Sequence, residues 1–332
     1  MNIRSLPCRR KIMSKQRPEN LSEAAVTGDL PAFREFLREG CNVNKCDGYG
    51  RTALYYAAAH NRLFMMKALI KAGADPNVRA NDGYGWTPLI CACCSGYEKA
   101  ARLLLKAGAE YRTSDKRGWT PLHYACRNGY PLTVRLLLDV GADPDSFDFN
   151  GSTPLNTAVV TNHCDIVRML LDAGADPNST KDPGAAAVHI AARDNNTEML
   201  GLLIDAGAGL EARDTNLDTP LFAAVTWNSH KAIEFLLAKG ADPNAADISG
   251  ESILHAAARN GSPAMMIKLA EAGADPFLTD LRGYTPLEML KDMYPGVYSQ
   301  EIGRLEPYFF SIKRLQEEDG SRQTDTGYEF DM

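Results

Sequence analysis

The sequence predicts an all-α repeat solenoid, a stack of short helix pairs, and two recurring signals lead to this prediction. The first is a helix start such as Thr120-Pro121-Leu122. Its Thr hydroxyl accepts a free helix N–H, and its Pro needs no donor at the first helical position. The second is a stop such as Gly141, which takes the left-handed conformation that ends a helix. A single helix pair cannot bury its own apolar faces, so it requires copies of itself on either side.

Both signals recur along the chain at a fixed interval. The interval is 33 residues, except for one of 35 residues that places a two-residue insertion between Gly73 and Thr87. The start positions are Thr52, Thr87, Thr120, Thr153, Ala186, Thr219, Ser252 and Thr285. The stop positions are Gly40, Gly73, Gly108, Gly141, Gly174, Gly207, Gly240 and Gly273. A stack grows linearly, so the 332 residues require no domain break.

A 33-residue period with Thr-Pro-Leu and Gly-Ala-Asp motifs resembles the ankyrin repeat family. The resemblance covers residues 18–293 and about nine repeats, of which the first and last act as caps. It implies antiparallel helix pairs with β-turn or hairpin fingers projecting from one edge. In this family an Asp begins each finger and a Gly closes it, as Asp115 and Gly118 do here. The residues between them, and the residue after the Gly, point outward.

Repeats six and seven depart from the pattern. Ala186 replaces the capping Thr of repeat six, which removes a cap worth about 1 kcal/mol, and Leu217 replaces the finger Gly of repeat seven. Two interpretations remain open. The neighbouring interfaces tolerate this drift, or repeats six and seven form a softer joint in the stack.

The two ends of the chain differ from the repeats. Residues 1–17 carry six basic residues and no acid, which predicts a disordered tail or, alternatively, a targeting or nuclear-import segment. Residues 294–315 are interrupted by Pro295-Gly296 and Pro307, so we expect two short capping helices there. Residues 316–332 are rich in acids, which predicts a disordered tail.

Charge and composition exclude several classes of protein. A net charge of -6 opposes binding to nucleic acid or to anionic lipid, and no apolar run reaches the length of a membrane span. The eight cysteines show no disulfide framework, and Cys93 and Cys126 occupy a position where the repeat has a small buried residue. We therefore expect a soluble monomer in the cytoplasm, with the nucleus as the alternative.

The sequence shows no catalytic constellation outside the repeat pattern. His123, His189 and His255 share one repeat position, and the resemblance implies that their imidazoles bridge neighbouring repeats. No phosphate loop, paired carboxylates or cysteine–histidine set stands apart from the repeats. We therefore expect no enzymatic activity, no cofactor and no metal.

The outward-facing positions predict a partner-binding surface. Exposed Trp, Tyr and Arg often supply about 2 kcal/mol or more each to an interface. The candidates on the fingers and first helices are Tyr49, Arg51, Tyr84, Trp86, Lys116, Arg117, Trp119, Arg127 and Phe149, with Trp227 on the later side. Tyr56, His60 and Tyr124 are expected to face the same groove. We expect an extended acidic or mixed segment of another protein to cross fingers two to five, so that the chain acts as a scaffold or adaptor; alternatively, the aromatic rings only brace adjacent fingers.

Two other functions remain open at this point. The chain could be the substrate-recognition subunit of a ubiquitin ligase, although residues 310–315 lack the Leu-Cys-Arg opening of a SOCS box. It could also sense a small anion or nucleotide through Lys116, Arg117 and Arg127, with stacking on Trp86 and Trp119.

The repeat loops also carry a modification motif. The asparaginyl hydroxylase of hypoxia signalling favours ankyrin loops with Leu eight residues before the Asn and Asp two residues before it. Asn77, Asn178 and Asn244 match this spacing. Since Asn also stabilises tight turns through its own side chain, a purely structural role is the alternative.

Overall fold

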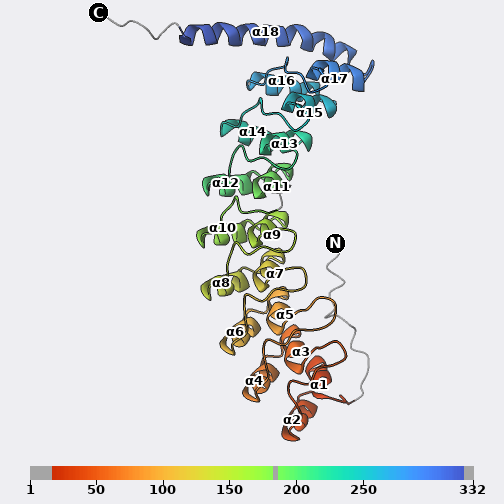
Figure 1. Ribbon diagram of the computed structural model, residues 1–332, viewed down its shortest axis with the longest axis vertical. Helices are drawn as coiled ribbons and strands as arrows, with labels where there is room; N and C mark the ends of the chain where they lie inside the picture. The colour runs from red at the N-terminus through yellow and green to blue at the C-terminus, as the bar shows by residue number, and fades with distance from the viewer. Residues whose placement is uncertain (1–16, 182–185, 325–332) are drawn as a thin grey trace, which may run out of the picture. The chain divides into compact units, whose positions relative to one another are not determined.

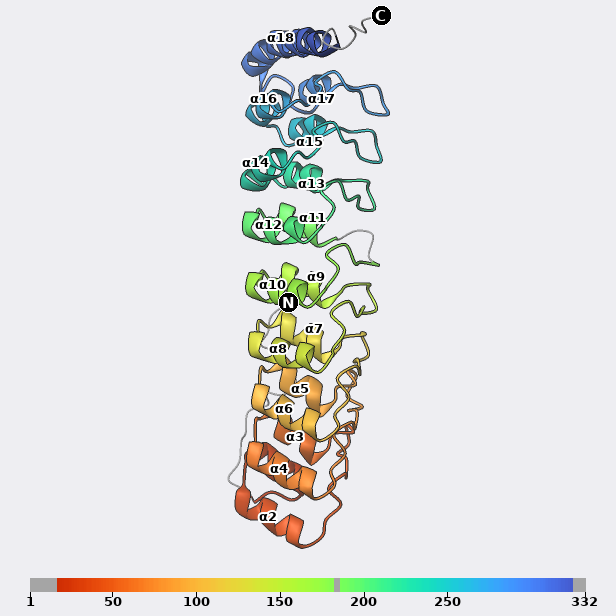
Figure 2. The ribbon, with the colours of Figure 1, turned by 90° about the vertical axis from the view of Figure 1, so that its left-hand side faces the viewer.

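The computed structural model describes residues 17–181 and 186–324, and the fold divides into two compact units. Unit 1 ends at Asp182 and unit 2 begins at Pro183. Both are stacks of paired helices with turns along one edge, which confirms the all-α repeat solenoid (Figures 1 and 2). Unit 1 contains α1 (Leu21–Thr27), α2 (Leu30–Arg38), α3 (Ala53–Ala59), α4 (Leu63–Lys71), α5 (Pro88–Cys94), α6 (Glu98–Lys106), α7 (Pro121–Arg127), α8 (Pro131–Asp139), α9 (Pro154–Val160) and α10 (Cys164–Asp172). Unit 2 contains α11 (Ala187–Arg193), α12 (Thr197–Asp205), α13 (Pro220–Thr226), α14 (His230–Ala238), α15 (Ile253–Arg259), α16 (Pro263–Glu271), α17 (Pro286–Met293) and α18 (Ser299–Thr324).

The helix starts and stops lie where the sequence predicts them. The hydroxyl of Thr120 accepts the backbone N–H of His123, and Pro121 occupies the first turn of α7. Gly141, just after α8, has a φ of 86°, in the left-handed region that glycine favours. Cys93 and Cys126 are fully buried between helices, and burial raises the pKa of both thiols. They behave as small core residues, as expected.

The described fingers that begin with an aspartate are hydrogen-bonded turns organised by that residue. In the finger of repeat four, the Asp115 Oδ1 atom accepts the backbone N–H groups of Arg117 (2.8 Å) and Trp119 (2.9 Å). The N–H of Gly118 donates to the Asp115 carbonyl, and Gly118 has a φ of 83°. These bonds fix the path of the finger, and they explain why Asp and Gly recur in it.

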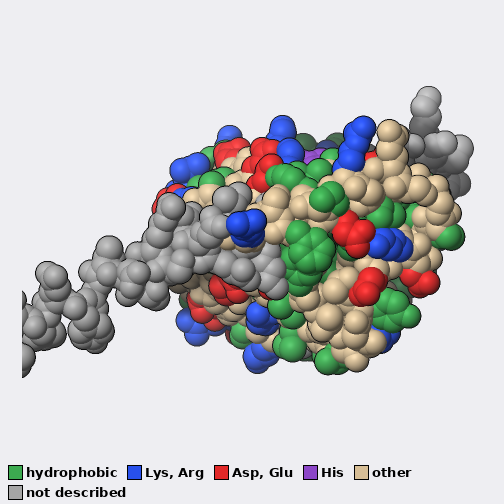
Figure 3. Space-filling view, turned by 90° about the horizontal axis from the view of Figure 1, so that it is seen from above, with side chains coloured by type: hydrophobic (Ala, Val, Ile, Leu, Met, Phe, Trp, Pro, Cys, Tyr) green, Lys and Arg blue, Asp and Glu red, His purple; other side chains and the backbone are tan. Residues whose placement is uncertain are grey.

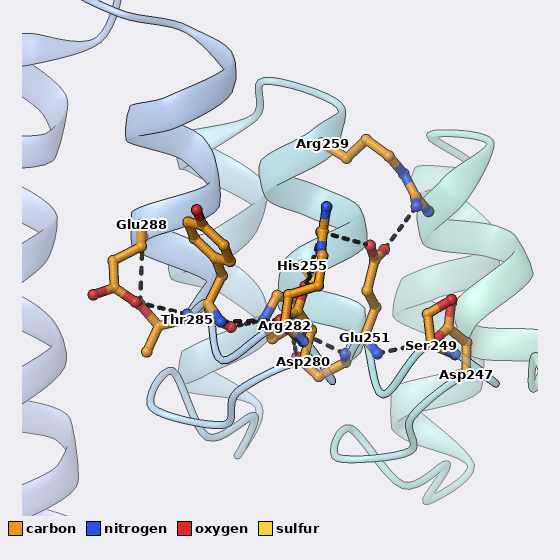
Figure 4. A network of polar contacts seen from close by, with 11 residues as sticks. Asp247, Ser249, Glu251, His255, Arg259, Asp280, Arg282, Thr285 and Glu288 are labelled. Atoms are coloured by element: carbon orange, nitrogen blue, oxygen red, sulfur yellow. Dashed lines mark hydrogen bonds and ion pairs between the residues drawn. The ribbon is translucent and has the colours of Figure 1, made fainter.

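Three histidines bridge neighbouring repeats as predicted. His123 Nε2 donates to the Ser152 carbonyl (3.3 Å) in unit 1, and His189 and His255 make the equivalent bonds to Asp218 (2.9 Å) and Tyr284 (2.9 Å) in unit 2. Glu251 of repeat eight pairs with Arg259 of its own repeat and with Arg282 of repeat nine (Figure 4). These hydrogen bonds from buried imidazoles help to hold the stack together.

The irregular repeats of unit 2 show the expected local consequences. Ala186 makes no side-chain cap at the start of α11. Leu217 takes the place of a finger glycine and is itself in the left-handed region, with a φ of 61°. A β-carbon is strained there, by about 1–2 kcal/mol. Repeats six and seven thus keep the repeat geometry without the residues that favour it.

The C-terminal segment differs from the prediction of two short helices. It forms one helix, α18, which continues through Pro307 and beyond residue 316 to Thr324. Leu305 and Phe309 are buried on one side of it, where α18 packs against α16 and α17, whereas Pro307 lies on the exposed side. Burial of these two side chains offsets the hydrogen bond that Pro307 cannot make.

This end of unit 2 leaves some apolar side chains in contact with solvent. Met293, Val297 and Phe310 are exposed, and Figure 3 looks onto this end, where green hydrophobic side chains lie among charged ones. Among the described helices, none is long and apolar enough to cross a membrane. The expectations for residues 1–16 and 325–332 lie outside the described residues.

Candidate functional site

The fingers of unit 1 form a continuous backbone ladder. The N–H of Asn81 donates to the Tyr49 carbonyl (2.6 Å), Lys116 to Tyr84 (2.9 Å) and Phe149 to Arg117 (3.0 Å). Each finger is therefore tied to the preceding one by its main chain. The result is a preformed surface whose side chains keep fixed positions relative to one another.

Three aromatic side chains stand out from this ladder. Tyr49 is 55% exposed and Phe149 is 76% exposed. Tyr84, on a finger between them, is also exposed. The three rings come from the fingers of repeats two, three and five. The finger of repeat four, between the last two, carries the basic residues Lys116 and Arg117 at its outward positions. The structure thus places these five predicted residues on one finger edge.

Two aromatic residues predicted to be outward-facing are buried instead. Trp86 is only 3% exposed, and its Nε1–H donates to the Tyr124 hydroxyl (3.0 Å). Tyr124 is also buried, and its hydroxyl donates to Asp115 Oδ2 (2.7 Å). Burial, together with the Asp115 carboxylate, raises the pKa of Tyr124. The chain Trp86–Tyr124–Asp115 closes the space between two fingers, so these two rings brace the stack, as the alternative prediction proposed.

Trp119 combines a bracing role with a partly open ring. Its Nε1–H donates to Asp148 Oδ2 (2.9 Å) in the next finger, which holds the indole across the inter-repeat boundary. The guanidinium carbons of Arg117 and Arg127 lie 5.4 and 5.1 Å from the centroid of the same ring. One indole therefore supports two cations.

Arg51 is held more firmly than the sequence suggested. Its Nη2 donates to Asp82 Oδ2 (2.7 Å), and both side chains are largely buried. Next to it lies a hollow of about 340 Å³, with Tyr49, Tyr56 and His60 on its walls. Tyr56 donates to Asp47 (2.6 Å), and burial together with that carboxylate raises the pKa of Tyr56 to about 12. The predicted first-helix positions Tyr56 and His60 therefore do line an open surface.

Unit 2 carries one predicted candidate and two residues that sequence reasoning missed. Trp227 is 64% exposed at the end of α13, with the Arg193 guanidinium carbon 6.0 Å from its ring centroid. Ile248 and Leu281 are exposed at the tips of neighbouring fingers. Both directly follow the finger Asp, as Phe149 does, so their repeat position was a signal that could have identified them.

The repeat-loop asparagines have structural partners. Asn77 Nδ2 donates to the Gly108 carbonyl (3.1 Å), and its Oδ1 accepts the N–H of Glu110 (2.8 Å). Asn178 lies in the equivalent loop, where its backbone N–H donates to Asp176 Oδ1 (2.9 Å). Asn244 makes the same pair of bonds as Asn77, with Gly273 and Asp275, so the Asn77 and Asn244 side chains connect successive repeats.

The described residues contain no group of three or more His, Cys, Asp or Glu that could hold a metal ion. The residues gathered on the finger edge of unit 1 are cations, aromatic rings and hydrogen-bonded carboxylates. Such an arrangement can bind through stacking, charge and shape.

Comparison with known proteins agrees with the repeat architecture. Models described as ankyrin repeats match residues 21–115, 107–181, 175–247 and 236–290. Protein phosphatase 1 regulatory subunit 27 of Mus musculus is 44% identical over 84 residues, which are 25% of this chain and 53% of that protein. Putative glutaminase 2 of Caenorhabditis elegans is 35% identical over 106 residues, 32% of this chain and 17% of that protein. The matches thus span about half of the first relative and much less of the second.

A solved structure shows the same fold. The crystal structure of the human ASB11 ankyrin repeat domain aligns with a TM-score of 0.60 and 30% identity, covering 68% of this chain and 100% of that one. The family models match most of the sequence, in agreement with this similarity. The chain belongs to the ankyrin repeat family.

Proposed function

We propose that the protein is a noncatalytic scaffold or adaptor that binds an extended segment of another protein across the fingers and first helices of unit 1. Ankyrin repeats are typical protein–protein interaction modules, which supports the general class. The single observation that carries the choice of surface is the row of exposed rings, Tyr49, Tyr84 and Phe149, on a hydrogen-bonded finger ladder. A rigid row of this kind offers large contact areas at a low cost in conformational entropy.

The form of the surface favours an extended partner. The ladder runs from finger to finger, and the three rings project from the fingers of repeats two, three and five. An extended segment could contact all three, whereas a small ligand would contact one. The Nε2 atoms of His123, His189 and His255 are engaged in inter-repeat hydrogen bonds, which supports the absence of catalysis in this proposal.

The experiment is affinity capture from host lysate followed by mass spectrometry. The variant combines Tyr49→Ala, Tyr84→Ala and Phe149→Ala, three changes at exposed rings that should leave the fold intact by circular dichroism. Ile248→Ala with Leu281→Ala provides a matched control, because these side chains are exposed on fingers of unit 2. The proposal expects partners that are retained by the control and lost by the variant. Retention of every partner by the triple variant would exclude this surface.

The cellular setting is part of the same proposal. No disulfide bond joins any of the seven cysteines in the described part, which supports a reducing compartment such as the cytoplasm, with the nucleus as the alternative. We also propose that the protein acts as a monomer. Light scattering of the purified chain at several concentrations would test this, and a concentration-dependent mass would contradict it.

The three loop asparagines remain proposed hydroxylation sites. The side chain of Asn77 is engaged with Gly108 and Glu110, so an enzyme could reach it only after local opening of the loop. Peptide mass spectrometry of protein from a host that has the hydroxylase tests this proposal, and unmodified peptides at all three sites would refute it.

A further inference from the structure

The two arginines beside Trp119 form an unusual concentration of positive charge in a chain of net charge -6. Arg117 approaches the indole from the finger of repeat four, and Arg127 approaches it from the end of α7. Each gains from the negative face of the ring, but two cations held around one ring repel each other. The neighbouring Lys116 is also exposed. A group that neutralises this charge would therefore be favoured here.

The protein itself neutralises only part of this charge. Asp115 lies 3.5 Å from Arg117, but its side chain is fully buried and its Oδ2 atom also accepts the Tyr124 hydroxyl. Within residues 17–181 and 186–324, neither Arg127 nor Lys116 lies within 4.0 Å of a carboxylate oxygen. The site therefore has a surplus of cations at the surface.

Arg117 is preorganised to accept an anion. Its Nη2 donates to the Tyr124 hydroxyl (2.8 Å), and its guanidinium carbon lies 5.8 Å from the centroid of the Tyr84 ring. The side chain remains 48% exposed. A guanidinium that is already fixed loses little conformational freedom on binding, and its planar fork matches a carboxylate.

We propose that Arg117 and Arg127, which both lie over the Trp119 ring, receive the carboxylates of an acidic segment of a partner protein. This proposal rests on the proposed function and specifies the chemistry of the segment that crosses unit 1. Charge complementarity selects the occupant, because three cations stand here without a matching number of exposed acids. Tyr84 and Phe149 lie on the adjoining fingers and would contact the apolar parts of the same segment.

The test measures fluorescence anisotropy of two labelled probes with the full-length protein, an extended oligoglutamate peptide and its oligoglutamine counterpart. Wild type should bind the glutamate peptide more tightly, and binding should weaken as salt is added. Arg127→Gln should lower the affinity for the glutamate peptide by about tenfold or more. Arg135→Gln is the matched control, because it removes the same charge from an exposed arginine on α8, away from the fingers.

Each result decides the proposal. A selective loss with Arg127→Gln and retention with Arg135→Gln support it. Equal affinity for the two probes, or equal losses in the two variants, would each overturn it. Affinity capture separates this failure from failure of the proposed function: partners lost with the aromatic triple variant but retained by Arg127→Gln would preserve the surface and refute its acidic specificity.

Discussion

The indole N–H of Trp119 donates to Asp148 Oδ2 over 2.9 Å and thereby ties two successive fingers together. In repeat two the same contact is made by Arg51, which donates to the finger Asp82. The residue before the helix cap therefore has a structural role as well as an outward position. The side chain that braces one finger against the next also forms part of the surface presented to a partner.

Trp119→Phe should destabilise unit 1. Asp148 is buried, so loss of the indole N–H leaves its Oδ2 atom without this donor, at a cost of about 1–3 kcal/mol in the free energy of unfolding. Chemical denaturation measures this cost. Trp227→Phe is the control, because that ring is largely exposed and its loss should change stability by less than about 0.5 kcal/mol. Similar costs in the two variants would show that the bond to Asp148 contributes nothing.

Ala186→Thr should stabilise unit 2. His189 Nδ1 is buried without a hydrogen-bond partner, whereas His123 Nδ1 in unit 1 contacts the Thr120 hydroxyl over 2.8 Å. A threonine at residue 186 would supply both this contact and the missing helix cap, worth about 1 kcal/mol in the free energy of unfolding. Thr153→Ala, at the same repeat position in unit 1, should lose a similar amount. An unchanged or lower denaturation midpoint for Ala186→Thr would contradict this explanation.

Asp218→Asn should stabilise unit 2 at neutral pH and have less effect in acid. Burial, with the charges of Asp214 and Asp247, raises the pKa of Asp218 to about 6. The carboxyl of an unfolded Asp has a pKa of about 3.9. Between about pH 3.9 and 6 the folded state therefore holds a proton that the unfolded state has lost, and the free energy of unfolding falls as the pH rises through this range. Above that pH the charged carboxylate carries its full penalty.

The comparison uses unfolding free energies of wild type and Asp218→Asn measured from about pH 4.5 to 7.5. Their difference should grow with pH and then level off. Asp292→Asn, at an exposed position on α17, controls for the loss of one negative charge. A difference that is constant over the whole range would show that Asp218 does not titrate in this way.

Tyr124→Phe should weaken both folding and binding. The hydroxyl connects Trp86, Asp115 and Arg117, and all three bonds depend on one oxygen atom. Its loss leaves buried polar groups without partners, at about 1–3 kcal/mol each, and releases the guanidinium of Arg117. Tyr56→Phe is the matched control, since that hydroxyl donates to Asp47 and interacts with Arg51 but not with Arg117. If Tyr124→Phe binds the oligoglutamate peptide as wild type does, Tyr124 does not position Arg117 for binding.

The repeat architecture could be predicted because every helix start, stop and finger is a local event repeated at one period. Thr120 caps its own helix α7, Gly141 ends the segment of α8, and Asp115 accepts hydrogen bonds from within its own finger. The C-terminal helix could not be predicted in this way. Pro307 is a strong local signal for a break, and it is outweighed by the burial of Leu305 and Phe309 against other helices.

The candidate surface was predicted in part, for the same reason. Tyr49, Tyr84 and Phe149 are exposed because their finger positions point outward in their own repeats. Trp86 is buried because a neighbouring repeat offers the Tyr124 hydroxyl to its N–H, a contact between residues 38 positions apart. Exposure at such a position depends on which side chains meet across the repeat boundary, and a single repeat does not contain that information.

Amide hydrogen exchange of the full chain, with and without a partner obtained by affinity capture, shows whether that partner crosses the fingers of unit 1. We expect added protection in the finger segments 47–51, 82–86, 116–119 and 148–152, with little change in the second helices of the same repeats. Protection confined to those second helices, or to unit 2, would contradict this expectation.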